Sequence, residues 1–118
     1  DKVDVYKKLA AESSSNADTA LYYANEALAL SKEINHPEQI VNSYLTISNV
    51  YEVLGEFDNC IEVLFDAREI ADSIQHDELL GMVYNNLGNA YRNIDDVDNS
   101  MEFYKRSAKL YKKVGNKL

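Results

Sequence analysis

The chain has 118 residues, enough for one domain with a workable core, and 46% hydrophobic with 27% charged residues is typical of globular proteins. Its net charge of -8 disfavours binding to nucleic-acid phosphates, so we expect no nucleic-acid partner. Four glycines and one proline are too few for a fold with many tight turns, and this composition favours helix.

Six amphipathic helices are predicted, because apolar residues recur at spacings of three and four along the chain. Asn16 or Asp18 is expected to cap the second helix, and Pro37 suits the first position of the third. His36 and His76 stand at equivalent helix starts. In chain order the predicted helices span about 2–14, 17–35, 37–54, 57–75, 77–94 and 97–115, with turns at Gly55-Glu56 and Asp95-Asp96.

The chain repeats itself with a period of 40 residues, which places equivalent apolar residues in register three times. The repeated positions keep helical spacing, so each unit pairs two helices in an antiparallel hairpin. Among the aligned sets are Ala17, Phe57 and Val97; Ala20, Cys60 and Ser100; Leu21, Ile61 and Met101; and Leu30, Ile70 and Leu110. The predicted units cover about residues 2–35, 37–75 and 77–115 of a single domain, 1–118.

Two octapeptides show the repeat most clearly: residues 44–51 read YLTISNVY and residues 84–91 read YNNLGNAY. Their tyrosines and their Ile or Leu form one helix face, which we expect to pack against the second helix of each hairpin. Ser48 and Gly88 lie in the middle of this bulky face, and a glycine inside a helix costs about 1 kcal/mol relative to alanine. A close crossing of the two helices is therefore predicted at both positions.

The octapeptides resemble the first-helix signature of the tetratricopeptide repeat (TPR), Trp-x-x-Leu-Gly-x-x-Tyr, which an Ala-x-x-x-Phe pattern follows in the second helix. Tyr84-x-x-Leu87-Gly88-x-x-Tyr91 matches it well, and Tyr44-x-x-Ile47-Ser48-x-x-Tyr51 matches it more loosely. The first unit is degenerate. A period of 40 is longer than the usual 34, which is similar to the long repeats of bacterial sensor kinases and regulators, Rap-type receptors and Pins-type adaptors.

The resemblance implies an all-α fold, a right-handed α-solenoid of three antiparallel helix hairpins. The last helix would then expose an apolar edge, which we expect to consist of Phe103, Leu110, Tyr111 and Val114. A continuation of the chain, a partner or self-association could cover it. Because the chain starts at Asp1 rather than Met, we expect it to be a fragment of a longer protein.

No catalytic, metal or cofactor site is predicted. His36 and His76 are one repeat apart, and no cysteine or further histidine supports a metal site near them. Cys60 is the only cysteine, so no internal disulfide can form, and it takes a small-residue position where a buried, inert thiol is expected. No stretch approaches the roughly 18 apolar residues of a membrane span, so no membrane insertion is expected within this segment. The compartment, cytoplasmic or periplasmic, stays open.

A polar stripe runs along the other side of the two octapeptide helices, and the resemblance implies that this face lines a concave groove. An asparagine amide both donates and accepts hydrogen bonds, so it can hold the backbone of a bound segment. The alternative is that Asn49 and Asn89 bond only to neighbouring helices. The predicted partner-binding residues are Asn42, Leu45, Asn49, Glu52, Met82, Asn85, Asn89 and Arg92, with Lys7 in the first unit.

The sequence therefore predicts a non-enzymatic module that binds a protein or peptide segment in this groove. The alternative is a sensory or dimerisation segment of a longer signalling protein, such as a sensor kinase or transcription regulator. Uneven charge supports the alternative: residues 52–78 hold nine acidic residues and one basic residue, whereas residues 105–118 hold six basic and none acidic. Solvated helix faces would explain the same charges.

Overall fold

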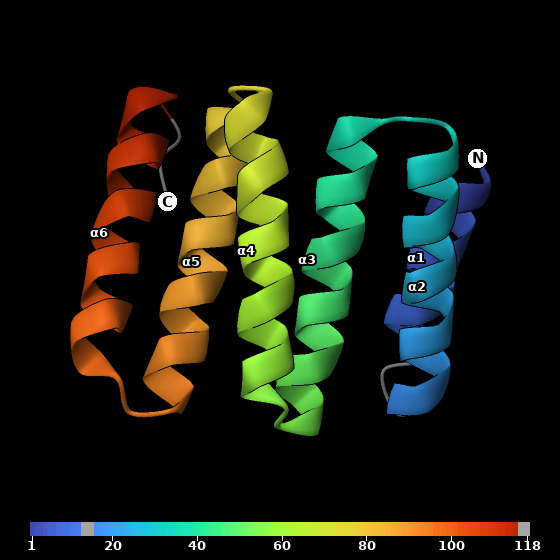
Figure 1. Ribbon diagram of the computed structural model, residues 1–118, viewed down its shortest axis with the longest axis horizontal. Helices are drawn as coiled ribbons and strands as arrows, with labels where there is room; N and C mark the ends of the chain where they lie inside the picture. The colour runs from blue at the N-terminus through green and yellow to red at the C-terminus, as the bar shows by residue number, and fades with distance from the viewer. Residues whose placement is uncertain (13–15, 116–118) are drawn as a thin grey trace.

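The structure is a computed structural model that describes residues 1–12 and 16–115 (Figure 1). The described residues contain α1 (Lys2–Glu12), α2 (Ala17–Glu33), α3 (Pro37–Leu54), α4 (Phe57–Ser73), α5 (Asp77–Asn93) and α6 (Val97–Lys113). The predicted bounds of α3 are confirmed, whereas α2, α4 and α6 each end two residues before the predicted position. The predicted end of α1 at residue 14 lies outside the described residues.

The early helix ends have a local cause in the backbone. Asn35 and Gln75 follow the C-caps of α2 and α4 and adopt left-handed φ angles of 54°, and Gly115 has φ 75° after α6. A left-handed residue at this position stops the helix and lets its amide bond back to the last turn. The apolar stripe continues to Ile34 and Ile74, so periodicity alone extends these helices too far.

Consecutive helices lie antiparallel and side by side, and the row runs from α1 and α2 at one end to α6 at the other (Figure 1). The hairpins are α1–α2, α3–α4 and α5–α6, and α2 contacts α3 as α4 contacts α5. In addition, α3 contacts both α1 and α5. The first helices of the hairpins therefore form one layer and the second helices form another, as in a solenoid.

The main core lies between α3, α4, α5 and α6. Leu64 of α4 and Leu87 of α5 are both 0% exposed, and the octapeptide tyrosines pack around them half-buried, as predicted. A smaller cluster of Ala10, Ala24 and Ile47 joins the first hairpin to α3. The prediction that Phe103 lies on an exposed edge is wrong, because its ring is buried and stacks on two core tyrosines, Tyr84 and Tyr91.

The close crossing predicted at Gly88 is confirmed. A Cβ atom added to Gly88 would lie only 2.6 Å from Cδ1 of Tyr104, whose ring covers the glycine. The missing side chain also opens the backbone to α6, where Ser100 donates its hydroxyl to the Gly88 carbonyl at 2.9 Å. Ser107 makes the same bond to Gly81 at 2.8 Å, so both buried hydroxyls are satisfied.

The residues at the joints act as helix caps. Asn16, rather than Asp18, caps α2 through its side-chain oxygen. His36 and His76 cap α3 and α5, because their Nδ1 atoms accept hydrogen bonds from the amides of Gln39 and Leu79. Both histidines therefore have a structural task at helix starts.

Candidate partner-binding surface

The layer of first helices brings the predicted partner-binding residues onto contacting elements. Asn42, Asn49 and Glu52 lie on α3, and the set on α5 comprises Met82, Asn85, Asn89 and Arg92. Lys7 lies on α1, which contacts α3, and α3 in turn contacts α5. Of these side chains, Asn49, Met82, Asn85 and Arg92 are exposed, and Lys7, Asn42, Glu52 and Asn89 are half-buried.

Leu45 does not belong to this surface. It is 6% exposed and lies in the main core with Leu79 and Val83 of α5. Its equivalent one repeat later, Asn85, is exposed because no described helix follows α5 in the layer of first helices. The two positions share a place in the repeat, but a neighbouring helix covers the leucine and none of the described helices covers the asparagine. Leu45 is therefore unavailable to a partner.

The asparagine at position 89 has a structural task. The Tyr104 hydroxyl of α6 donates a hydrogen bond to Oδ1 of Asn89, across the seam of the last hairpin. This amide oxygen helps to hold the Tyr104 ring over Gly88. The alternative interpretation, a bond to a neighbouring helix, therefore describes Asn89, whereas Asn49 is exposed on α3.

Lys7 links the first two hairpins. Its ammonium donates to Oε1 of Gln39 on α3 at 3.0 Å and lies 3.7 Å from a carboxylate oxygen of Asp4. The amine has an acceptor on each side, so it is held at the edge of the layer of first helices.

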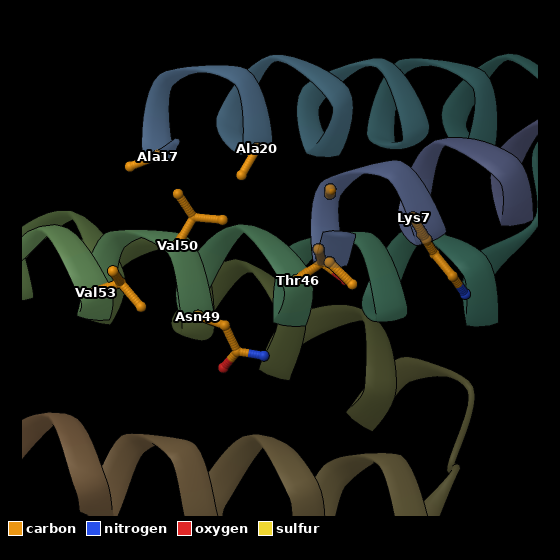
Figure 2. A pocket seen from close by; sticks show the side chains of 9 residues that line it. Lys7, Ala17, Ala20, Thr46, Asn49, Val50 and Val53 are labelled. Carbon is orange, nitrogen blue, oxygen red and sulfur yellow. The ribbon is translucent and has the colours of Figure 1, made fainter. Parts of the chain in front are cut away.

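An apolar cavity of about 190 Å³ opens beside Asn49, between α1, α2 and α3. Figure 2 shows Val50 of α3 pointing toward Ala17 and Ala20 of α2, while Asn49 points away from α2. The cavity is lined by Lys7, Ala10, Ala11, Ala17, Ala20, Thr46, Asn49, Val50 and Val53. The four alanines leave the space that larger core residues fill elsewhere.

Sequence reasoning missed most of this cavity. The signal was available at the start of α2, because Ala17 and Ala20 stand where the middle unit has the larger Phe57 and Cys60. We interpreted these small residues as degeneracy of the first unit. Only their convergence on Val50 and Val53 reveals an open space.

The environment of Cys60 makes its thiol unreactive. Burial raises the pKa of the Cys60 thiol to about 11, with a smaller contribution from the charge of Glu52. The thiolate is the reactive form, so this cysteine is a poor nucleophile near neutral pH. Within residues 1–12 and 16–115, no group of three or more potential ligands is arranged to hold a metal ion, and no helix is long and apolar enough to cross a membrane.

Comparison with known proteins identifies relatives over the whole chain. The sequence model of the family described as the SusR N-terminal TPR domain matches residues 1–118. A search of curated proteins finds no match. Among solved structures, the TPR domain of Arabidopsis FLU is similar with a TM-score of 0.85 and 14% identity, covering 95% of this chain and 96% of that domain.

Two further structures extend the likeness. BtubC (BKLC) from P. vanneervenii has a TM-score of 0.82 and 21% identity over 94% of this chain and 46% of its own. The N-terminal domain of stress-induced protein-1 (STI-1) from C. elegans has a TM-score of 0.72 and 19% identity over 96% of this chain and 91% of that domain. At these identities the structures inform on fold alone, and they confirm the predicted all-α TPR solenoid.

Proposed function

Because the chain belongs to the SusR N-terminal TPR domain family, we propose that it is a non-enzymatic module that binds a protein or peptide segment along α1, α3 and α5. A TPR fold is typically a protein-interaction module, and binding on this particular layer is our proposal. The observation that carries it is the position of Asn49, an exposed amide at the mouth of an apolar cavity.

This arrangement suits a short segment with one apolar side chain. The cavity of about 190 Å³ would take the apolar group, and burying it would drive binding. The amide of Asn49 would then bond to the backbone beside that side chain, whatever the neighbouring residues of the segment are. Asn85, exposed on α5, would hold the segment further along.

The test starts from peptides selected on the purified chain from a displayed peptide library. Asn49→Ala combined with Asn85→Ala should weaken the selected peptide about tenfold, because each lost hydrogen bond is worth roughly 0.5–1.5 kcal/mol. Isothermal titration calorimetry measures the change. Asn25→Ala on α2 is the matched control, since it also removes an exposed asparagine amide but on the other layer.

Equal binding by the double variant and the parent chain would contradict the assignment of this surface. A peptide that Asn25→Ala weakens as much as the double variant would place the site on the layer of second helices instead. Unfolding curves of the parent chain and of both variants show whether the changes act through stability.

A second candidate function is the N-terminal sensory or dimerisation segment of a longer signalling protein. The family description calls this domain the N-terminal TPR domain of SusR, which supports a chain that continues past Leu118. Leu110 and Tyr111 on α6 are half-buried and Val114 is exposed, so this edge could hold a second copy or a following segment. Sedimentation at rising concentration tests self-association: a monomer at every concentration and salt level contradicts it.

A further inference from the structure

A second open groove, of about 500 Å³, lies between α5 and α6. Its apolar part comes from Leu80 and Tyr84 of α5 and Leu110 of α6. Three basic side chains complete the lining: Arg106, Lys109 and Lys113, all on α6 and all exposed. In a chain of net charge -8, this is a local concentration of positive charge around an apolar floor.

The groove is separate from the surface proposed above. Residues in an α-helix are about 100° apart around its axis, so Leu80 and Tyr84 point roughly 140° and 100° away from Asn85, the residue of α5 that the proposed partner surface uses. The partner surface on α1, α3 and α5 and this basic groove therefore lie on different sides of α5. A ligand in one would leave the other open.

Two of the three cations already have carboxylate partners, one exposed and one half-buried, and one of the two cations also lies over aromatic rings. Arg106 bonds to Glu102 at 3.2 Å and lies over the rings of Tyr84 and Phe103, at 5.8 and 5.4 Å from their centroids. Lys113 pairs with Asp77 at 3.0 Å. Exposed ion pairs contribute little stability in water, so a carboxylate arriving with an apolar group can compete for these cations.

The positive charge is particular to the last unit. One repeat earlier, the positions of Arg106, Lys109 and Lys113 hold Asp66, Glu69 and Ser73. The floor is more alike, since Ile40 and Tyr44 are the equivalents of Leu80 and Tyr84. The repeat therefore supplies the shape of the groove, and three substitutions on α6 supply its charge.

We propose that this groove binds an acidic segment of another protein, with an aromatic or aliphatic side chain on the apolar floor and flanking carboxylates on Arg106, Lys109 and Lys113. A rigid guanidinium over tyrosine favours a carboxylate in a defined place. Burial of the apolar anchor adds binding free energy that charge alone would not supply in water.

A second copy of the chain is the less favourable occupant. Its α2 carries an exposed Tyr22 between Asp18 and Glu26, which has suitable chemistry. However, α4 lies between α2 and α6 (Figure 1). A symmetric contact of α2 with α6 would oppose the acidic stripes of the two α4 helices, formed by Asp58, Glu62, Asp66 and Glu69. Like charges in such a contact cost free energy.

The probe is a fluorescein-labelled peptide of ten residues in which one phenylalanine and one leucine are flanked by glutamates. Binding is followed by fluorescence anisotropy at 50 and 300 mM salt. Lys109→Glu should weaken binding about tenfold at low salt, because an attraction to the peptide carboxylates becomes a repulsion. Arg106→Gln should weaken it by a smaller factor. Lys8→Glu, an equal charge change on α1, is the matched control and should leave the affinity within about twofold.

Each outcome decides between occupants. Failure of the peptide to bind overturns the groove proposal. Equal weakening by Lys8→Glu and Lys109→Glu also overturns it, because the affinity would then depend on net charge alone. If sedimentation without peptide shows a dimer that Lys109→Glu dissociates, the occupant is a second copy. Asn49→Ala with Asn85→Ala should not change binding of this probe, so the outcome is independent of the function proposed above.

Discussion

In each hairpin the two helices pack along a seam, the line of contact between them. At equivalent positions of this seam, the last hairpin has a smaller residue on its first helix and a larger one on its second helix than the middle hairpin has. In the middle hairpin, α3 has Val41 and Ser48 at these positions, and α4 has Ala71 and Leu64. In the last hairpin α5 supplies Gly81 and Gly88, while α6 supplies Tyr111 and Tyr104. A smaller residue on the first helix is therefore matched by a larger side chain on the second.

This difference shows that the repeat constrains the summed volume across a seam more than the residue at any one position. Interiors are packed to crystal-like density, so a glycine on one helix requires a large neighbour on the other. The exchange also changes the surface. A tyrosine at position 104 carries a hydroxyl that reaches Asn89, whereas Leu64 at the equivalent position has no polar atom.

Breaking the middle seam should have the largest effect. Leu64→Ala should lower the free energy of unfolding by about 2–5 kcal/mol, because Leu64 is 0% exposed and its truncation leaves a cavity in the main core. Urea denaturation followed by circular dichroism measures this. Met101→Ala, at a half-exposed position, is the control and should change stability by less than about 0.5 kcal/mol. A loss below about 1 kcal/mol for Leu64→Ala would mean that the seam collapses to fill the space.

Adding one methyl group to the last seam should have the next largest effect. Gly88→Ala would place Cβ within 2.6 Å of the Tyr104 ring. We expect a loss of about 1–3 kcal/mol from overpacking, which outweighs the gain of roughly 1 kcal/mol in helix propensity. The double variant Gly88→Ala with Tyr104→Leu has a leucine where the middle hairpin has Leu64, and it should recover part of the lost stability in urea denaturation. An unchanged midpoint for Gly88→Ala would contradict the size exchange at this position.

The smallest effect is expected at Gly81, which lies about two turns before Gly88 on α5. A Cβ at Gly81 would lie 3.4 Å from the Tyr111 ring, an ordinary contact. Gly81→Ala should therefore raise the free energy of unfolding by up to about 1 kcal/mol through helix propensity. Thermal denaturation of this variant beside Gly88→Ala gives the sharpest comparison, because the two substitutions are chemically identical. Losses of similar size would show that both rings need the glycine beneath them.

Local sequence signals determined most of the fold. Periods of three and four residues specify amphipathic helices, Asn16 and Pro37 mark helix starts, and the period of 40 specifies stacked hairpins. These signals work because caps and helix faces depend on residues within about one turn of each other. The helix ends at Glu33 and Ser73 were missed, since the apolar stripe does not show where the backbone turns left-handed.

The candidate surfaces depended on contacts that the sequence does not display. Position in the repeat is the same for Leu45 and Asn85, and for Asn49 and Asn89, yet only one member of each pair is exposed. A neighbouring helix covers Leu45, and a tyrosine from the partner helix of the hairpin engages Asn89. The sequence by itself determined the helices and their stacking, because these follow from local periodicity. Only the tertiary structure decided which polar and apolar groups stay open to a partner, because exposure depends on residues distant in the chain.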